Sequence, residues 1–251
     1  MQELERFLGL PDMASGGKGQ VDELLLFVHL LMVALFVGWI CYFVFVLFRF
    51  SKKRHPVADH AGVKSHLSTW IEAAVALIEG ALLVGLAMPL WAKTVDAFPK
   101  GKDVTTIKII GQQFLWNAWY PGTNGVFVSQ DEKFAAGANP FGFNTNDPNY
   151  RANFTVSENI YVPVNKPVVA YVSSLDVIHC FTIRPMRVTQ DAIPGMSIPA
   201  WFDPVKEGTY QINCAQLCGA GHFGMRAYVH VVSQDAYDKW LAQKTAAAAA
   251  K

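Results

Sequence analysis

A short segment near the C-terminus carries four side chains of kinds that bind metal ions. Within twelve residues it holds two thiols, an imidazole and a thioether, in the order Cys214, Cys218, His222 and Met225. A further histidine, His179, lies in an apolar run of strand-forming residues at 177–181. Thiolate, imidazole and thioether ligands together favour copper over harder metals. The sequence therefore predicts a copper site built from this segment and His179.

The second cysteine distinguishes this set from a single-copper electron-transfer site, which needs one Cys, two His and a weak axial Met. Because a thiolate sulfur can bridge two metals, Cys214 and Cys218 predict a dinuclear copper core with one histidine on each metal. Met225 is expected to be a weak ligand to one copper, and the backbone carbonyl of Gln216 a ligand to the other. Such a core suits electron transfer, because the thiolates spread one electron over two metals and little geometry changes with redox state. It leaves no open position for a substrate.

Spacing alone leaves two other interpretations open. The same two cysteines and two histidines match a Cys₂His₂ zinc site, although zinc would leave Met225 without a role. A disulfide between Cys214 and Cys218 suits an oxidising compartment, but it would need neither His222 nor Met225.

Composition narrows the class of protein. The chain has 251 residues, of which 52% are hydrophobic and 16% are charged, against about 25% charged in an ordinary soluble domain. Its 21 Lys and Arg nearly balance its 20 Asp and Glu, so no net field attracts a polyanion and we expect no nucleic-acid partner. The apolar residues concentrate in 24–91, whereas 103–232 has the composition of an ordinary β-rich domain.

Residues 24–91 are predicted to form a transmembrane helical hairpin. The segments 24–48 and 70–91 are each long enough, as helices, to cross a hydrocarbon core of about 30 Å. The loop between them is basic, and the positive-inside rule therefore places it in the cytoplasm. Both termini then lie on the outer side, including an N-terminal tail of residues 1–23. The basic residues of this loop are Arg49, Lys52, Lys53, Arg54 and Lys64, against one acid, Asp59.

Two carboxylates in the second span, Glu72 and Glu79, are seven residues apart and so share a helix face. A carboxylate within a membrane normally faces protein or water. We therefore expect this face to dock against another membrane protein. A plain interfacial position also explains Glu72.

Residues 103–232 are predicted to form a β-sandwich or barrel, because short β-branched and aromatic runs alternate with turn residues. A loop rich in Gly, Asn and Pro is expected as an insertion at 121–150. Residues 233–251 are expected to form a short helix over 234–244, capped by Ser233, and a frayed tail at 246–250. The expected strands are 104–110, 113–119, 159–163, 167–173, 177–184, 208–213 and 226–232.

The pattern Cys-x₃-Cys-Gly-x₂-His-x₂-Met at residues 214–225 resembles the dinuclear copper A motif of subunit II of haem-copper (cytochrome c) oxidases. Residues 176–179, 190–195, 111–116 and 65–72 are similar to other segments of that family. The resemblance implies two membrane spans followed by a cupredoxin-like β-sandwich, in a mainly β protein anchored in a bacterial inner (plasma) membrane. The copper domain would lie on the periplasmic side.

The resemblance also implies the function of an electron-entry subunit in a terminal respiratory oxidase, a proton-translocating oxidoreductase. Cytochrome c, or another haem c donor, would reduce the copper pair. Electrons would then pass to subunit I, where oxygen is reduced to water, so this chain would hold no residue of the oxygen-reducing site. Subunit I, other oxidase subunits and the membrane are the implied partners.

Roles for single residues follow from the same resemblance. Trp116, with Phe114 beside it, is expected at the surface above the copper pair as the point of electron entry. Phe114 stands where the family usually has a tryptophan. Glu72 falls at the position of a glutamate that serves as a proton entrance to subunit I.

Two aspartates and a glutamine fall at family positions around the copper. Asp176 is expected to orient His179 from outside the metal, and Asp191 to lie at the turn toward subunit I. Gln216 replaces the glutamate that the family has between its two cysteines. The family's magnesium site at the subunit interface therefore lacks one carboxylate here, although Asp191 remains.

Two other kinds of protein could use the same ligands, namely a membrane-tethered copper carrier and a structural zinc domain of an envelope complex. A carrier would keep its ligands few and exposed, and would need neither Glu72 nor the aromatic run before the β-domain. Metal content and an EPR spectrum distinguish all three.

Overall fold

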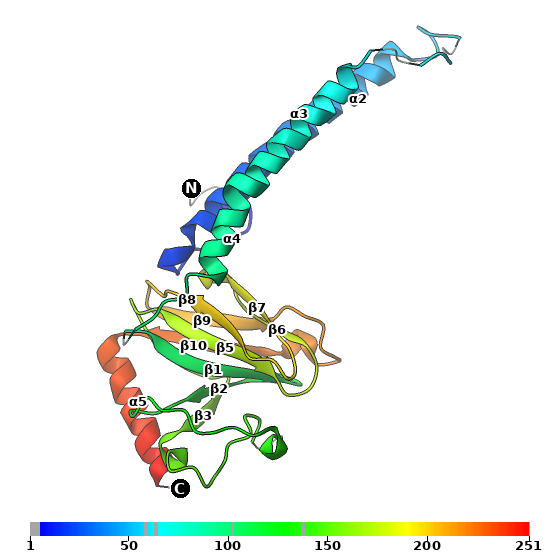
Figure 1. Ribbon diagram of the computed structural model, residues 1–251. Coiled ribbons are helices and arrows are strands. Elements are labelled where there is room, and N and C mark those ends of the chain that lie inside the picture. The colour runs from blue at the N-terminus through cyan, green and yellow to red at the C-terminus, as the bar shows by residue number, and fades with distance from the viewer. Residues whose placement is uncertain (1–5, 58–59, 63–64, 102, 137–138, 251) are drawn as a thin grey trace. The chain divides into compact units, whose positions relative to one another are not determined.

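The computed structural model describes residues 6–57, 60–62, 65–101, 103–136 and 139–250 (Figure 1). The chain divides into two compact units. One is helical and comprises residues 20–96. The other, a β-unit, comprises residues 97–251 together with the N-terminal residues 1–19.

The helical unit contains two helices that are long and apolar enough to cross a membrane, Gly19–Arg49 and Leu67–Val95. The first is α2 (Gly19–Arg49), and the second comprises α3 (Leu67–Leu82), a π-helical segment η2 (Leu83–Ala87) and α4 (Met88–Val95). Pro89 has no N–H with which to bond the carbonyl of Gly85, and the π-helical turn includes that carbonyl. Both helices extend beyond the predicted spans of 24–48 and 70–91.

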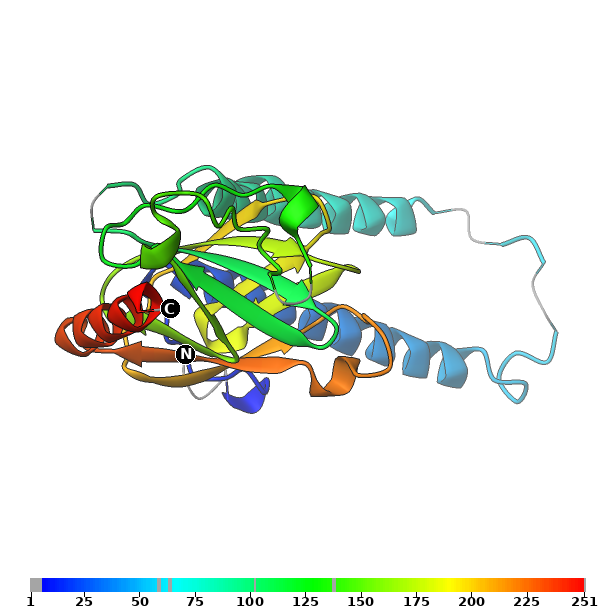
Figure 2. The same ribbon diagram turned by 90° about the horizontal axis from the view of Figure 1, so that it is seen from below.

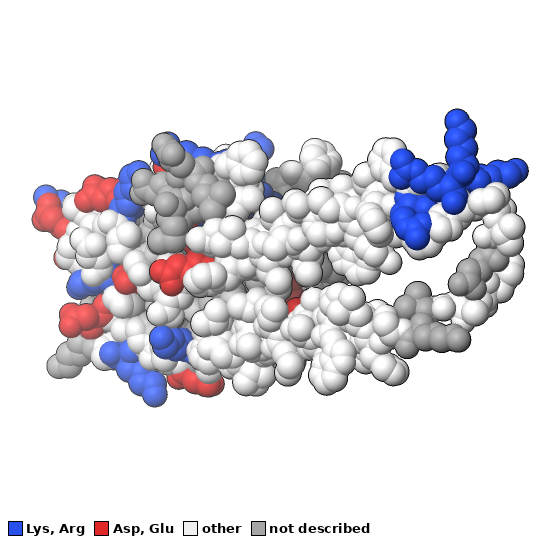
Figure 3. Space-filling model, turned by 90° about the horizontal axis from the view of Figure 1, so that it is seen from above, with Lys and Arg blue, Asp and Glu red and all other residues white. Residues whose placement is uncertain are grey.

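Basic side chains gather where α2 ends. Arg49, Lys52, Lys53 and Arg54 are exposed, and they form a blue group at one end of the hairpin in Figure 3. Lys64 and Asp59 lie outside the described residues. The excess of cations after α2 is the asymmetry that orients a hairpin with its loop in the cytoplasm.

The β-unit is built on two five-stranded sheets. The first has the strand order β3-β2-β1-β5-β8 and the second β4-β10-β9-β6-β7. Apolar residues from both sheets share one core, with Ile107 and Ile109 from the first, and Phe181, Ile212 and Val229 from the second. The strands are β1 (Thr105–Gln112), β2 (Leu115–Tyr120), β3 (Phe154–Ser157), β4 (Asn159–Pro163), β5 (Val168–Ser174), β6 (His179–Ile183), β7 (Val188–Ala192), β8 (Ile198–Phe202), β9 (Gly208–Cys214) and β10 (Arg226–Val232).

Three of these strands, β3, β7 and β8, were not predicted from the sequence. All three lie at sheet edges, where one side of the strand needs no partner. β8 contains Pro199, which is tolerated at an edge because the proline donates no hydrogen bond to the ladder. β7 carries the polar residues 189–191, which overlap the segment 190–195 singled out in the sequence.

The N-terminal residues before α2 belong partly to the β-unit and do not form a free tail. Ala14 and Ser15 are buried, with 1% and 0% of their surface exposed. The Ala14 N–H donates to the carbonyl of Pro185 at 2.7 Å, and the Val205 N–H donates to the carbonyl of Ala14 at 2.9 Å. Gly16 fits here because a Cβ would approach Cγ1 of Val205 to 2.8 Å.

The insertion at 121–150, green in Figure 2, has a small core of its own. Phe127, Val128, Phe141 and Phe143 pack around Trp119 of β2. The ammonium group of Lys108 lies 4.4 Å from the centre of the Trp119 ring, and burial lowers the pKa of this lysine. Aromatic packing therefore holds a segment whose composition predicts only a loop.

The C-terminal helix α5 (Gln234–Ala249) is red in Figures 1 and 2. The Ser233 hydroxyl caps it by accepting from the Ala236 N–H at 3.3 Å. Trp240 packs on Tyr120, Phe154 and Tyr161 of the sheets. The expected frayed tail is wrong for residues 246–249, which continue the helix because alanine is the strongest helix former.

Candidate metal centre

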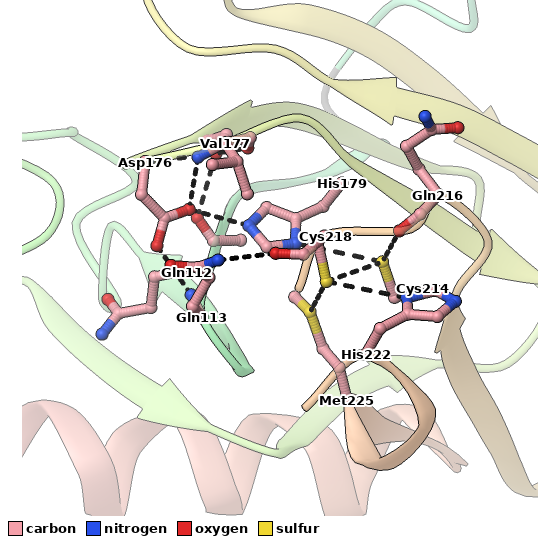
Figure 4. A network of polar contacts seen from close by, with 12 residues as sticks. Gln112, Gln113, Asp176, Val177, His179, Cys214, Gln216, Cys218, His222 and Met225 are labelled. Atoms are coloured by element: carbon pink, nitrogen blue, oxygen red, sulfur yellow. Dashed lines mark hydrogen bonds and ion pairs between the residues drawn. The ribbon is translucent and has the colours of Figure 1, made fainter. Parts of the chain in front are cut away.

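The five sequence-predicted ligand side chains lie together at one end of the second sheet (Figure 4). His179 is the first residue of β6, and Cys214 is the last residue of β9. Antiparallel pairing of these strands, with Phe181 opposite Cys214, places both residues at the same end. The chain then loops through Cys218 and a 3₁₀ turn, η6 (His222–Gly224), to Met225, directly before β10.

The two thiol sulfurs and two imidazoles form a compact group. The sulfurs of Cys214 and Cys218 are 3.8 Å apart. Nδ1 of His179 lies 3.9 Å from the sulfur of Cys214, and Nδ1 of His222 lies 3.6 Å from the sulfur of Cys218. Each histidine thus approaches a different cysteine.

Two weaker donors complete the group. The thioether sulfur of Met225 lies 3.7 Å from the sulfur of Cys218. The backbone carbonyl of Gln216 lies 3.1 Å from the sulfur of Cys214, while the Gln216 side chain points away from the group in Figure 4. Each cysteine therefore has one imidazole and one weak donor beside it.

Three of the five candidate ligand side chains are shielded from solvent, and Cys214 and His222 are half-buried. His179, Met225 and Cys218 expose 0%, 2% and 4% of their surface. Burial, and next the hydrogen bond with the Cys214 thiol, raise the pKa of the Cys218 thiol to about 11. A thiol buried in this way becomes a thiolate when a metal ion displaces its proton.

Asp176 orients His179. Its Oδ1 lies 2.8 Å from Nε2 of the imidazole, so Nδ1 is the ring nitrogen that faces the thiols. The carboxylate also accepts from the backbone N–H groups of Val177 and Gln113, each at 2.7 Å. Burial alone would raise the pKa of Asp176, but the hydrogen bonds from Gln113 and His179 outweigh it and hold the pKa below its ordinary value.

Trp116 is not at the surface, and the prediction of its position is wrong. Its side chain has 0% exposure, and its ring packs edge-on against His179 and Phe181, with centroids 5.9 and 5.6 Å apart. Successive residues of a strand point to opposite faces, and Trp116 lies on the core-facing side of β2. Phe114, in the turn before β2, is the exposed aromatic residue, at 37%.

Sequence reasoning gave no role to two residues in the turn region of β1 and β2. The amide Nε2 of Gln113 donates to the carbonyl of Cys218 at 2.6 Å. Gly111 lies against the His179 ring, where a Cβ would approach Cδ2 to 2.9 Å. The run 111–116 was recognised as a motif, but nothing in it indicates which ligand each residue contacts.

The other predicted residues lie outside the metal group. Asp191 is exposed on β7 and pairs with Cys180 on β6, whose side chain is buried. Glu72 and Glu79 are exposed on α3, in the helical unit.

Comparison with known proteins decides the family. The family described as cytochrome c oxidase subunit II, periplasmic domain, matches residues 105–232. This chain belongs to the cytochrome c oxidase subunit II family. A relative in Bradyrhizobium diazoefficiens, alternative cytochrome c oxidase subunit 2, is 30% identical over 228 residues, which cover 90% of this chain and 80% of the relative. Cytochrome c oxidase subunit 2 of Cereibacter sphaeroides is 30% identical over 247 residues, covering 94% and 79%.

Among solved structures, the periplasmic domain of subunit II of cytochrome oxidase from Bradyrhizobium japonicum is similar to this chain. It is 29% identical and covers 59% of this chain and 97% of its own, with a TM-score of 0.44.

Family membership confirms the expected fold class and location. This subunit II is anchored in a membrane by two apolar helices and carries a β-sheet domain on the periplasmic side. It is a subunit of a haem-copper oxidoreductase. In this chain, the ligand atoms of His179, Cys214 and Cys218 all lie within 4.8 Å of one another, and such a group could hold a metal ion.

Proposed function

We propose that this subunit receives electrons from a c-type cytochrome at a dinuclear copper centre. It then delivers them to subunit I, which carries haem and copper. The observation that carries the proposal is the separation of the two histidines, because His179 approaches the sulfur of Cys214 and His222 approaches that of Cys218. Bound there, a copper pair bridged by two thiolates would supply one-electron transfer with little change of geometry.

The spacing of the two sulfurs fits bridging. They lie 3.8 Å apart, which is less than twice a metal–sulfur bond of about 2.3 Å. A metal on either side of the sulfur pair can therefore contact both thiolates. Met225 on one side and the Gln216 carbonyl on the other would then serve as the weak ligands.

A single tetrahedral zinc is supported less well. Zinc in a Cys₂His₂ site needs all four donors around one point. Among the described residues, His179, Cys214 and Cys218 form a mutual group within 4.8 Å that does not include His222, whose Nδ1 lies 3.6 Å from the sulfur of Cys218. Zinc would also leave the buried thioether of Met225 without a function.

A copper carrier is supported less well too. A carrier hands its metal to a partner, so its ligands need access from solvent. His179, Met225 and Cys218 expose at most 4% of their surface, and Cys214 and His222 are half-buried. Burial of most of the group suits a resident redox centre, because ligands that do not reorganise keep electron transfer fast.

Residues around the site fix the orientation of the His179 ring. Asp176 keeps Nδ1 of His179 toward the thiols, and Trp116 packs against the same ring from the core side. Phe114 is the exposed aromatic side chain of the turn that contacts the cysteine loop. In our proposal, electrons enter the subunit at Phe114. Trp116 then lies behind His179, away from an arriving donor.

The proposal extends to protons and to magnesium. Glu72, near the start of α3 at the cytoplasmic end, would pass protons to a polar path in subunit I. A magnesium ion at the interface with subunit I would have Asp191 as its carboxylate, since Gln216 offers only an amide side chain and a carbonyl.

The test is metal analysis and EPR spectroscopy of the full-length subunit loaded with copper. Two copper ions per chain sharing one unpaired electron support the proposal, and one zinc ion per chain contradicts it. Cys218→Ser should abolish the two-copper spectrum, because a hydroxyl does not replace a bridging thiolate. Met225→Leu should keep both coppers and change the reduction potential, because an axial thioether is a weak, long bond.

A further inference from the structure

We propose that Gln113 is a positioning residue of the metal centre. It fixes the loop that carries the cysteines to the aspartate that orients His179. This inference rests on the proposed copper function. Gln113 supplies no ligand. Its role is to connect the two halves of the ligand set, which come from distant parts of the chain.

The connection is a continuous series of hydrogen bonds, drawn in Figure 4. Nε2 of His179 meets Oδ1 of Asp176 at 2.8 Å, and Oδ2 of the same carboxylate accepts from the backbone N–H of Gln113 at 2.7 Å. The side-chain amide of Gln113 then donates to the carbonyl of Cys218 at 2.6 Å. The series therefore begins at one ligand and ends on the backbone of another.

The cysteine loop is shaped to receive this turn. Gly219 has a φ of +135°, and a Cβ on it would approach Nε2 of Gln113 to 2.8 Å. At Gly221, a Cβ would approach Cδ2 of the Phe114 ring at a distance that no side chain tolerates. Glycine at both positions lets Gln113 and Phe114 lie directly on the loop backbone.

The loop has few other restraints near Cys218. Between β9 and the start of η6, the backbone turns through Gly219 and Gly221, and glycine restricts the backbone less than any other residue. Leu217 and Phe223 point outward, with 78% and 93% of their surfaces exposed, and so do not anchor it. The hydrogen bond from Gln113 therefore restrains the backbone at the Cys218 carbonyl, whereas the thiol is held by burial in the core.

A natural control lies next to this residue. The side chain of Gln112 accepts, through Oε1, from the Asn117 amide at 3.1 Å, and so serves β2 rather than the cysteine loop. Alanine substitution of Gln112 or of Gln113 removes the same side-chain atoms from neighbouring positions. Only Gln113 substitution removes the bond to Cys218.

The experiment compares Gln113→Ala and Gln113→Met with Gln112→Ala in the full-length subunit. Methionine keeps the length of the side chain but has no amide to donate. Hydrogen exchange of residues 218–225 is measured without metal, and the rate of copper release to a chelator and the EPR spectrum are measured with it. We expect faster exchange in that loop and about tenfold faster copper release for both Gln113 variants, the size expected for one lost hydrogen bond.

Gln112→Ala should match the wild type in all three measurements. If the Gln113 variants exchange at the Gln112→Ala rate in residues 218–225, the positioning role is wrong. The positioning role would also be wrong if Gln113→Met released copper as slowly as the wild type and matched it in hydrogen exchange. Packing of the side chain, without its hydrogen bond, would then be enough to hold the loop. Failure of the wild type to bind two coppers would contradict the proposed function, and the metal-free exchange comparison would still decide the role of Gln113.

Discussion

The imidazole of His179 lies directly on the backbone of Gly111, where a Cβ would come within 2.9 Å of Cδ2. The same Cβ would meet Cζ3 of Trp116 at 3.0 Å. Ring atoms cannot move aside as a flexible side-chain end can, so the close approach fixes the plane of the ligand. Gly111 therefore limits the position of the His179 ring on this side of the candidate metal centre.

Gly111→Ala should therefore displace His179. Overpacking of this kind typically lowers the free energy of unfolding by about 1–3 kcal/mol. We also expect a changed EPR spectrum of the copper-loaded subunit. Gly224→Ala is the matched control, because no atom lies within 4 Å of a Cβ at that position and its φ is ordinary. Equal spectra for the two variants would show that the His179 ring is not held by this contact.

Substitutions of Trp116 and Phe114, two aromatic residues of the run 111–116, should have different effects. Trp116→Ala opens a cavity in the core beneath His179, and should lower the free energy of unfolding of the β-unit by about 3–5 kcal/mol. Phe114→Ala should lower stability less than Trp116→Ala, because the Phe114 ring is 37% exposed, and should slow the reduction of the copper-loaded subunit by reduced cytochrome c. Denaturant unfolding and stopped-flow reduction separate the two effects. Reduction of Phe114→Ala at the wild-type rate would remove this ring from the electron path.

If Glu72 passes protons to subunit I as proposed, Glu72→Gln should lower steady oxygen consumption by the assembled oxidase, because an amide cannot release or accept protons as a carboxyl group does. Copper content and assembly should stay normal. Glu79 lies on the same face of α3 but two turns deeper. Oxygen consumption of Glu79→Gln shows whether the effect is specific to Glu72 or follows from the loss of either carboxylate. Wild-type turnover in Glu72→Gln would leave that residue with a packing or interfacial role.

Asp147 should make the stability of the insertion depend on pH. Its carboxylate accepts from the backbone N–H groups of Asn149 and Ser129, each at 2.8 Å, and these bonds lower its pKa to about 2. A carboxylate whose pKa is lower in the folded state stabilises that state above the unfolded pKa of about 3.9, and the contribution disappears as the pH falls toward 2.

The wild type should therefore be more stable than Asp147→Asn at about pH 6, and the difference should shrink below about pH 4. Thermal unfolding followed by near-ultraviolet circular dichroism measures this difference. A difference that stays constant down to about pH 2.5 would show that the ionised carboxylate is not the stabilising form.

Local sequence was enough to predict the membrane spans and most of the candidate ligand group. Cys214, Cys218, His222 and Met225 lie within one short loop, so their proximity follows from chain connectivity whatever the rest of the fold. The spans are similarly local, because a long apolar run needs only its own hydrogen bonds to form a helix. His179 is the distant member of the candidate group, and its residue type and apolar strand predicted that it would lie near the cysteines, as it does.

Which side chains support this candidate group depends on the tertiary structure. Gln113 and Cys218 are 105 residues apart, and nothing in local pattern says that they meet. Trp116 and Phe114 are both aromatic residues of one run, but the pairing of β1 with β2 sends Trp116 into the core and leaves Phe114 outside. Edge strands β7 and β8, and the burial of Ala14, likewise depend on contacts between distant segments. Local patterns specify residue type and periodicity, whereas packing against distant neighbours selects the buried face and the hydrogen-bond partner.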